Sequence, residues 1–111
     1  MNPLTWAAAR AFGLPPATTT DVRIERGVRL PAPDGVELLT DLYLSRPVEP
    51  RPVVLIRSPY GRGAPWGLFA RAFAERGYHA VIQSCRGTFG SGGQLTFSAE
   101  AGDGRAAADW I

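Results

Sequence analysis

The sequence contains no lysine: all twelve of its basic residues are arginine, against ten acidic residues over 111 positions. A P-loop needs a lysine on the nucleotide phosphates, and a pyridoxal-phosphate enzyme needs a lysine amine, so both classes are excluded. Histidine and cysteine occur once each, as His79 and Cys85. A zinc site with several such ligands and an internal disulfide are therefore excluded as well. We expect neither a cofactor nor a bound metal.

Long apolar runs and clusters of like charge are also missing. No run approaches the ~20 apolar residues of a transmembrane helix, and the segment from Met1 to Phe12 lacks the basic start of a secretory signal. The arginines are spread from Arg10 to Arg105 with acidic residues between them, whereas nucleic-acid binding needs clustered positive charge. We expect a cytoplasmic protein that binds neither nucleic acid nor a membrane.

Two segments with a period of two predict an antiparallel hairpin. Apolar and charged residues alternate over residues 21–30 and again over residues 36–44, which is typical of strands with one wet face. Between them, Pro31 to Gly35 (PAPDG) has the composition of a tight turn. A short helix over residues 4–12 and a linker to residue 20 are expected before the hairpin.

After a proline-rich connection, continuous apolar runs replace the alternation. Residues 53–56 (VVLI) and 78–83 (YHAVIQ) predict strands covered on both faces of a parallel sheet. Between them, residues 65–76 predict a helix whose apolar face contains Leu68, Phe69, Ala72 and Phe73. The chain from residue 53 is thus a βαβ unit, followed by a glycine-rich loop at residues 87–93.

A further helix is expected over residues 99–111, with an apolar face made of Ala106, Ala107, Trp110 and Ile111. Such a helix normally continues into another parallel strand. We therefore expect the front part of a larger fold; the alternative is a complete four-strand mini-domain.

Three segments match one family in order and spacing: residues 28–43 around Asp34-Gly35, residues 51–61 (RPVVLIRSPYG), and residues 73–93 around Arg76-Gly77-Tyr78 and Arg86-Gly87. They resemble the cocaine-esterase-type and Xaa-Pro dipeptidyl-peptidase-type serine hydrolases, the CocE/NonD group. The resemblance implies an α/β-hydrolase fold. Residues 21–111 would form an incomplete N-terminal part of that domain, after the helix and linker of residues 1–20.

The family hydrolyses esters or amides through a Ser-Asp-His triad, and its nucleophile stands on a G-x-S-x-G elbow. Ser91 does not fit this pattern, because Phe89 stands two positions before it. His79 begins its strand, about 16 Å from the carboxyl edge where such sites lie. Cys85 has no base beside it in the sequence and is expected to be a small buried side chain. We expect the chain to be inactive alone.

Tyr60 is the remaining catalytic candidate. It directly follows the strand predicted over residues 53–58, which places it at the carboxyl edge of the sheet. The resemblance implies that its hydroxyl donates to the oxyanion of the tetrahedral intermediate, where a preorganised donor contributes ~3 kcal/mol. The alternative is an ordinary tyrosine at the end of a strand. Relatives often carry aspartate where this chain has Ser84, so we expect altered hydrogen bonding around Arg86.

Two functions are left open. The first is the N-terminal portion of a serine acyl hydrolase, whose full-length relatives act on a small ester or amide. The second is a non-catalytic binding or regulatory module that completes its sheet with a partner chain. In both, the edge of strand 53–58 is open to self-association or complementation.

Overall fold

The computed structural model describes residues 7, 11, 13, 15–19 and 21–111. Its elements, in chain order, are β1 (Val22–Pro31), β2 (Glu37–Ser45), β3 (Val53–Ser58), α2 (Trp66–Ala74), β4 (His79–Ser84), a 3-10 turn (Phe97–Ala99) and α3 (Glu100–Trp110). The helix predicted over residues 4–12 falls largely outside the described residues. No helix in the described part of the chain is long and apolar enough to cross a membrane.

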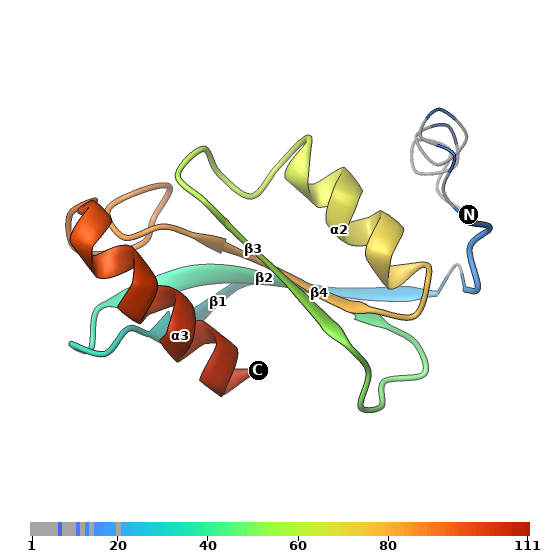
Figure 1. Cartoon of the computed structure of the whole chain (residues 1–111), viewed down its shortest axis with the longest axis horizontal. Helices are drawn as coiled ribbons and strands as arrows, with labels where there is room; N and C mark the ends of the chain where they lie inside the picture. Colours follow the sequence, from blue (N-terminus) through green and yellow to red (C-terminus); the bar gives the residue numbers. More distant parts are fainter. Residues whose placement is uncertain (1–6, 8–10, 12, 14, 20) are drawn as a thin grey trace.

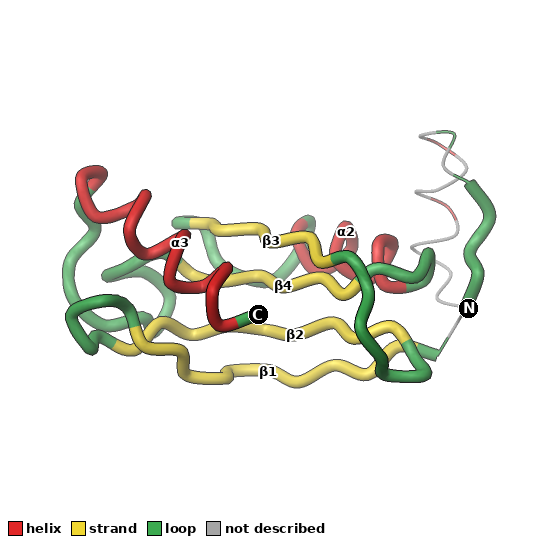
Figure 2. The backbone as a smooth tube through the Cα atoms, turned by 60° about the horizontal axis from the view of Figure 1, so that its bottom comes forward, coloured by secondary structure: helices red, strands yellow, loops and turns green. Residues whose placement is uncertain are grey.

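The strands form a four-stranded mixed sheet in the order β1-β2-β4-β3 (Figures 1 and 2). β2 pairs antiparallel with both β1 and β4, whereas β3 and β4 are parallel neighbours joined through α2. This arrangement confirms the predicted hairpin and the predicted βαβ unit. It also brings the carboxyl ends of β3 and β4 to one edge of the sheet.

Local chemistry closes the hairpin. The Asp34 side chain accepts a hydrogen bond from the Val36 amide at 3.2 Å, and Gly35 has a φ of +86°, as the turn composition predicts. A bulge between Glu25 and Val28 was not predicted. It contains Gly27, whose φ of +68° suits a residue without a Cβ.

The two helices cover opposite faces of the sheet, as Figure 2 shows. α2 packs on the face that carries Tyr43, Ala80 and Ile82, while α3 contacts Arg57 on the other face. Because β2 has a strand on each side and α2 packs against it, polar residues in its middle are enclosed. Asp41, expected on a wet face, is only 4% exposed.

The predicted apolar face of α2 is only partly confirmed. Ala72 is buried as predicted, together with Ala70 and Ala74, whereas Phe69 and Phe73 are exposed. The cause is Tyr43, which is buried between the sheet and the helix; a Cβ added at Gly67 would lie 2.9 Å from its hydroxyl. Small residues let the helix approach the sheet over this ring.

The predicted apolar face of α3 is also only partly confirmed. Ala107 is buried as predicted, but the other buried residue is Asp103, one turn earlier, and half of Trp110 is exposed. An ion pair of Asp103 with Arg86 turns this side of the helix toward the sheet. The expectation that strand 53–58 is covered on both faces is wrong too, since residues 54–57 are half-buried and Val53 is exposed at the sheet edge.

Candidate functional site

The candidate site is the edge where β3 and β4 end and their following loops meet. Tyr60 lies two positions beyond the end of β3, and its amide donates to the Ser58 hydroxyl at 3.0 Å. Its side chain is 77% exposed. The structure therefore places Tyr60 at the carboxyl edge, in the position that the sequence predicts.

Gly61 and Phe89 bring the two loops into contact. Gly61 is buried with a φ of +98°, and a Cβ added there would lie 3.3 Å from the Phe89 ring. Phe89 has a φ of +43°, which is rare for a residue other than glycine, and it is 61% exposed. The ring therefore covers the backbone directly beside Tyr60.

Arg62 connects both loops to the sheet. Its Nε donates to Asp41 Oδ1 at 3.1 Å, and its Nη1 donates to Ser84 Oγ at 2.6 Å and to the Phe89 carbonyl at 3.0 Å. The Ser84 hydroxyl, which the sequence analysis connected with Arg86, accepts from Arg62 in this structure. Sequence reasoning missed Arg62; the available signal was its place two residues after Tyr60, directly beyond the matched segment 51–61.

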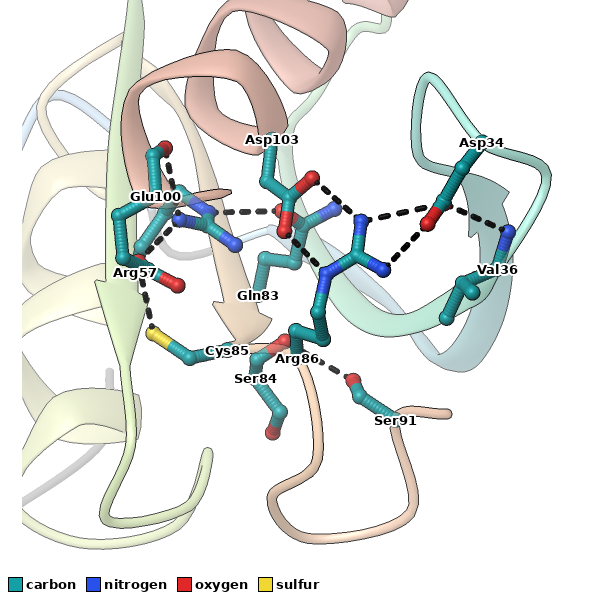
Figure 3. Close-up of polar contacts among 10 residues, drawn as sticks. All are labelled: Asp34, Val36, Arg57, Gln83, Ser84, Cys85, Arg86, Ser91, Glu100 and Asp103. Atoms are coloured by element: carbon teal, nitrogen blue, oxygen red, sulfur yellow. Dashed lines mark hydrogen bonds and ion pairs between the residues drawn. The ribbon is translucent and has the colours of Figure 1, made fainter. Parts of the chain in front are cut away.

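Arg86 is held between two carboxylates (Figure 3). Its Nε and Nη2 donate to Asp103 at 3.0 and 2.9 Å, and its Nη1 and Nη2 donate to Asp34 at 2.6 and 3.1 Å. Hydrogen bonds to Asp103 and then Asp34 raise the pKa of Arg86. The hydrogen bond from Arg86, followed by that from the Val36 amide, lowers the pKa of Asp34. This clasp joins the hairpin turn, the loop after β4 and α3.

A second polar cluster on the α3 face encloses the cysteine (Figure 3). Arg57 donates to Gln83 Oε1 at 2.9 Å and pairs with Glu100, which also accepts from the Cys85 thiol at 3.3 Å. Burial, followed by the contact with Glu100, raises the pKa of Cys85 to about 11. Cys85 is 4% exposed, which confirms the prediction of a small buried side chain.

Ser91 and His79 both have structural hydrogen bonds. The Ser91 hydroxyl donates to the Ser84 carbonyl and accepts from the Leu39 amide, both at 2.9 Å. His79 begins β4; its Nδ1 accepts from the Ser45 amide at 3.2 Å, and its Nε2 donates to the Glu49 carbonyl at 2.7 Å. The two side chains lie at opposite ends of β4 and form no nucleophile–base pair.

Among the residues that the structure describes, no group of three or more His, Cys, Asp or Glu side chains could hold a metal ion.

The mixed sheet, its two covering helices and the loops at the carboxyl edge define an N-terminal portion of an α/β hydrolase. Two solved structures share this arrangement. An α-amino acid ester hydrolase is 27% identical, with a TM-score of 0.67 over 87% of this chain and 20% of its own. A CocE/NonD family hydrolase from Staphylococcus aureus has a TM-score of 0.69 over 80% of this chain and 20% of its own; at 22% identity, it shows the fold alone.

Residues 34–111 match the X-Pro dipeptidyl-peptidase (S15) family, and the chain belongs to that family. The cocaine esterase of Rhodococcus sp. (strain MB1 Bresler) is 35% identical over 77 residues, which cover 65% of this chain and 13% of the esterase. The resemblance to CocE/NonD hydrolases is thereby confirmed. The chain spans only a small part of the length of the relatives that it matches.

Proposed function

We propose that this chain supplies the N-terminal part of the catalytic domain of a serine acyl hydrolase, with Tyr60 as an oxyanion donor for a small ester or amide substrate. The observation that carries the proposal is the place of Tyr60, which is exposed and lies two residues beyond the end of β3 on the carboxyl edge. Ligands of open α/β sheets bind at this edge. The phenol hydroxyl is a neutral hydrogen-bond donor. Its hydrogen bond is stronger to the charged oxyanion of the transition state than to the neutral carbonyl oxygen of the substrate.

We further propose that these 111 residues do not hydrolyse esters by themselves. The hydroxyl of Ser91 is hydrogen-bonded to the backbone at the end of β4, and the ring of His79 to the backbone at the end of β2. The Cys85 thiol is buried beside Glu100. A nucleophile must come from a further segment. The edge of β3 that faces away from β4 is the place where such a segment can add a parallel strand.

A graft tests the role of Tyr60. In the graft, residues 34–111 replace the matching segment of the Rhodococcus cocaine esterase. The hydrolysis of cocaine is then measured. We expect Tyr60→Phe to lower kcat by roughly 10²–10³-fold with little change in KM, because the donor acts in the transition state. Tyr78→Phe is the matched control on α2's side of the sheet. A Tyr60→Phe graft with unchanged kcat would show that Tyr60 is not the donor.

The inactivity of the chain alone is tested separately. The purified 111-residue chain is treated with p-nitrophenyl acetate and with a fluorophosphonate probe for activated serines. We expect neither turnover nor labelling above the level of the Ser91→Ala variant. Turnover that disappears in Ser91→Ala would refute the proposal.

A non-catalytic module that pairs with a partner chain is the second candidate. The apolar edge strand β3, with Val53 exposed, favours it. Retention of full kcat in the Tyr60→Phe graft, together with no labelling of the chain, would favour this function over the first.

A further inference from the structure

We propose that Arg62 is a positioning residue, which fixes Tyr60 by fastening the loop 59–63 to the loop 87–93 and both to β2. The inference rests on the proposed role of Tyr60. Arg62 would affect the reaction only by holding Tyr60 in position. Arg62 follows Tyr60 by two positions, so restraint of its side chain restrains the same short turn.

The contacts of Arg62 come from three separate parts of the chain. Asp41 lies on β2, Ser84 ends β4, and the carbonyl of Phe89 belongs to the loop after β4. The Arg62 side chain is 18% exposed, and that of Asp41 is 5% exposed. The bonds to Asp41 and Ser84 are partly buried, and hydrogen bonds of charged groups are stronger there than at the surface, whereas the bond to the Phe89 carbonyl is exposed. The three bonds therefore restrain the loops relative to the sheet.

Asp41 is a fixed anchor for this arrangement. Its Oδ1 also accepts from the Gly27 amide at 3.0 Å, and its Oδ2 lies 3.5 Å from Arg26 Nη1. The bulge in β1 provides both partners, since it places Gly27 and Arg26 opposite Asp41. The carboxylate is thus held from the side of β1 and cannot follow a movement of the Arg62 loop.

The loop after β4 is equally well restrained where it meets Arg62. Phe89 keeps a φ of +43° because its neighbours hold it there: the Arg62 bond to its carbonyl, its ring against Gly61, and the two hydrogen bonds of Ser91. Gly61 is therefore enclosed by the Phe89 ring on one side and by the Arg62 linkage on the other. Tyr60, its immediate neighbour, has little freedom of backbone movement.

The planar guanidinium is what this role requires. Its separate N–H groups reach the carboxylate, the hydroxyl and the carbonyl at once, in fixed directions. A lysine would still place a positive charge near Asp41, but a single ammonium cannot span the same three acceptors. Arg62→Lys therefore separates compensation of the Asp41 charge from linkage of the two loops.

Hydrogen–deuterium exchange on the full 111-residue chain in dilute solution tests the inference. The reporting amides are hydrogen-bonded in both loops: Tyr60 to Ser58 Oγ, and Gly87, Thr88 and Ser91 within the second loop. We expect Arg62→Lys to accelerate exchange in both loops by roughly tenfold or more, while the β1–β2 hairpin exchanges as in the unaltered chain. Ser84→Ala, which removes one acceptor of Arg62, is expected to act on the same two loops to a smaller extent.

Arg29→Met is the matched control, because the Arg29 side chain is 70% exposed and its ion pair within the described residues is with the exposed Glu37. It should leave both loops unchanged. Three results would overturn the inference: loops in Arg62→Lys that exchange as in the unaltered chain, acceleration in one loop without the other, or equal acceleration in every segment. The assay measures no hydrolysis. A failure here leaves the graft result for Tyr60 standing, and a Tyr60→Phe graft with full kcat removes the proposed function without altering the exchange result.

Discussion

Arg86 and Asp103 form a two-pronged ion pair that fastens α3 to the end of β4, with donor–acceptor distances of 3.0 and 2.9 Å. Asp103 is 2% exposed, so its carboxylate depends on Arg86 for compensation of its charge. The Asp34 carboxylate on the opposite side of the guanidinium is more than half exposed. The pair with Asp103 is therefore the one that decides whether α3 stays on the sheet.

The first prediction concerns this attachment. Asp103→Asn removes a buried negative charge, so the Arg86 guanidinium loses one of its two carboxylate partners. The urea midpoint of unfolding should therefore fall clearly. Asp109→Asn on the exposed side of the same helix is the control and should change the midpoint little. Equal midpoints for the two variants would contradict the role of the clasp.

The second prediction is a pH dependence at Asp34. Its pKa is lowered in the folded chain, so the stability that it contributes is complete above the ordinary aspartate pKa of about 3.9 and is lost as the pH falls through the lower folded pKa. The unfolding midpoints of the unaltered chain and of Asp34→Asn should differ by a constant, small amount above that pH. The difference should disappear only at more acidic pH. A difference that vanishes already near pH 5 would contradict the lowered pKa.

The third prediction concerns the thiol of Cys85, whose pKa is raised to about 11 by burial and by Glu100. The unfolded thiol ionises near its ordinary pKa of about 8.5, so the native state loses stability as the pH rises from there toward the folded value. Iodoacetamide at pH 9 should modify the folded chain far more slowly than the chain in urea. Mass spectrometry measures this ratio, with Cys85→Ser as the unlabelled control. Equal rates would show that the thiol is accessible as thiolate in the native state.

The part of the fold that local chemistry determines was predictable from the sequence. Alternation over residues 21–30 and 36–44 requires only that one face of a strand be drier than the other, and Asp34 and Gly35 form their turn from their own backbone preferences. The position of Tyr60 followed in the same way, since it depends only on the end of β3. The role of Tyr60 as an oxyanion donor stays a prediction.

The remaining features depend on contacts between distant segments. Hydrophobicity favours Phe69 and Phe73 as the buried face of α2, but the ring of Tyr43 is buried below the helix, and the buried positions of α2 are alanines. Asp41 occupies a position that alternation assigns to solvent, and its burial beside Arg62 follows from the pairing of β2 with strands on both sides. No spacing rule links residues 41, 62 and 89, so the linkage of the two loops required the structure.

The fourth prediction concerns the glycine loop that carries Phe89. Gly87 has a φ of +75°, and a Cβ there would lie 2.5 Å from the Leu95 nitrogen, which belongs to the backbone. Gly87→Ala should destabilise the chain by about 1–2 kcal/mol from the left-handed conformation alone, and by more because the backbone must shift. Gly63→Ala is the matched control, since its Cβ would meet nothing within 4 Å and its φ is not positive. Urea unfolding of both variants measures the difference, and a Gly87→Ala chain as stable as Gly63→Ala would show that this turn is not fixed.

The fifth prediction concerns the outer edge of β3. Val53 is 39% exposed on a strand whose neighbour in the described sheet is β4 alone, so the 111-residue chain should self-associate as its concentration rises. A charge at this position opposes edge-to-edge pairing, because a second strand would bury it without a partner. Val53→Lys should therefore increase the monomer fraction in sedimentation velocity.

Val48→Lys adds the same charge at a more exposed valine outside the strand, and it should change the monomer fraction much less. If both variants shift the fraction equally, net charge is the cause and the β3 edge is not the contact. A chain that remains monomeric and melts cooperatively at high concentration would show that the edge needs no added strand.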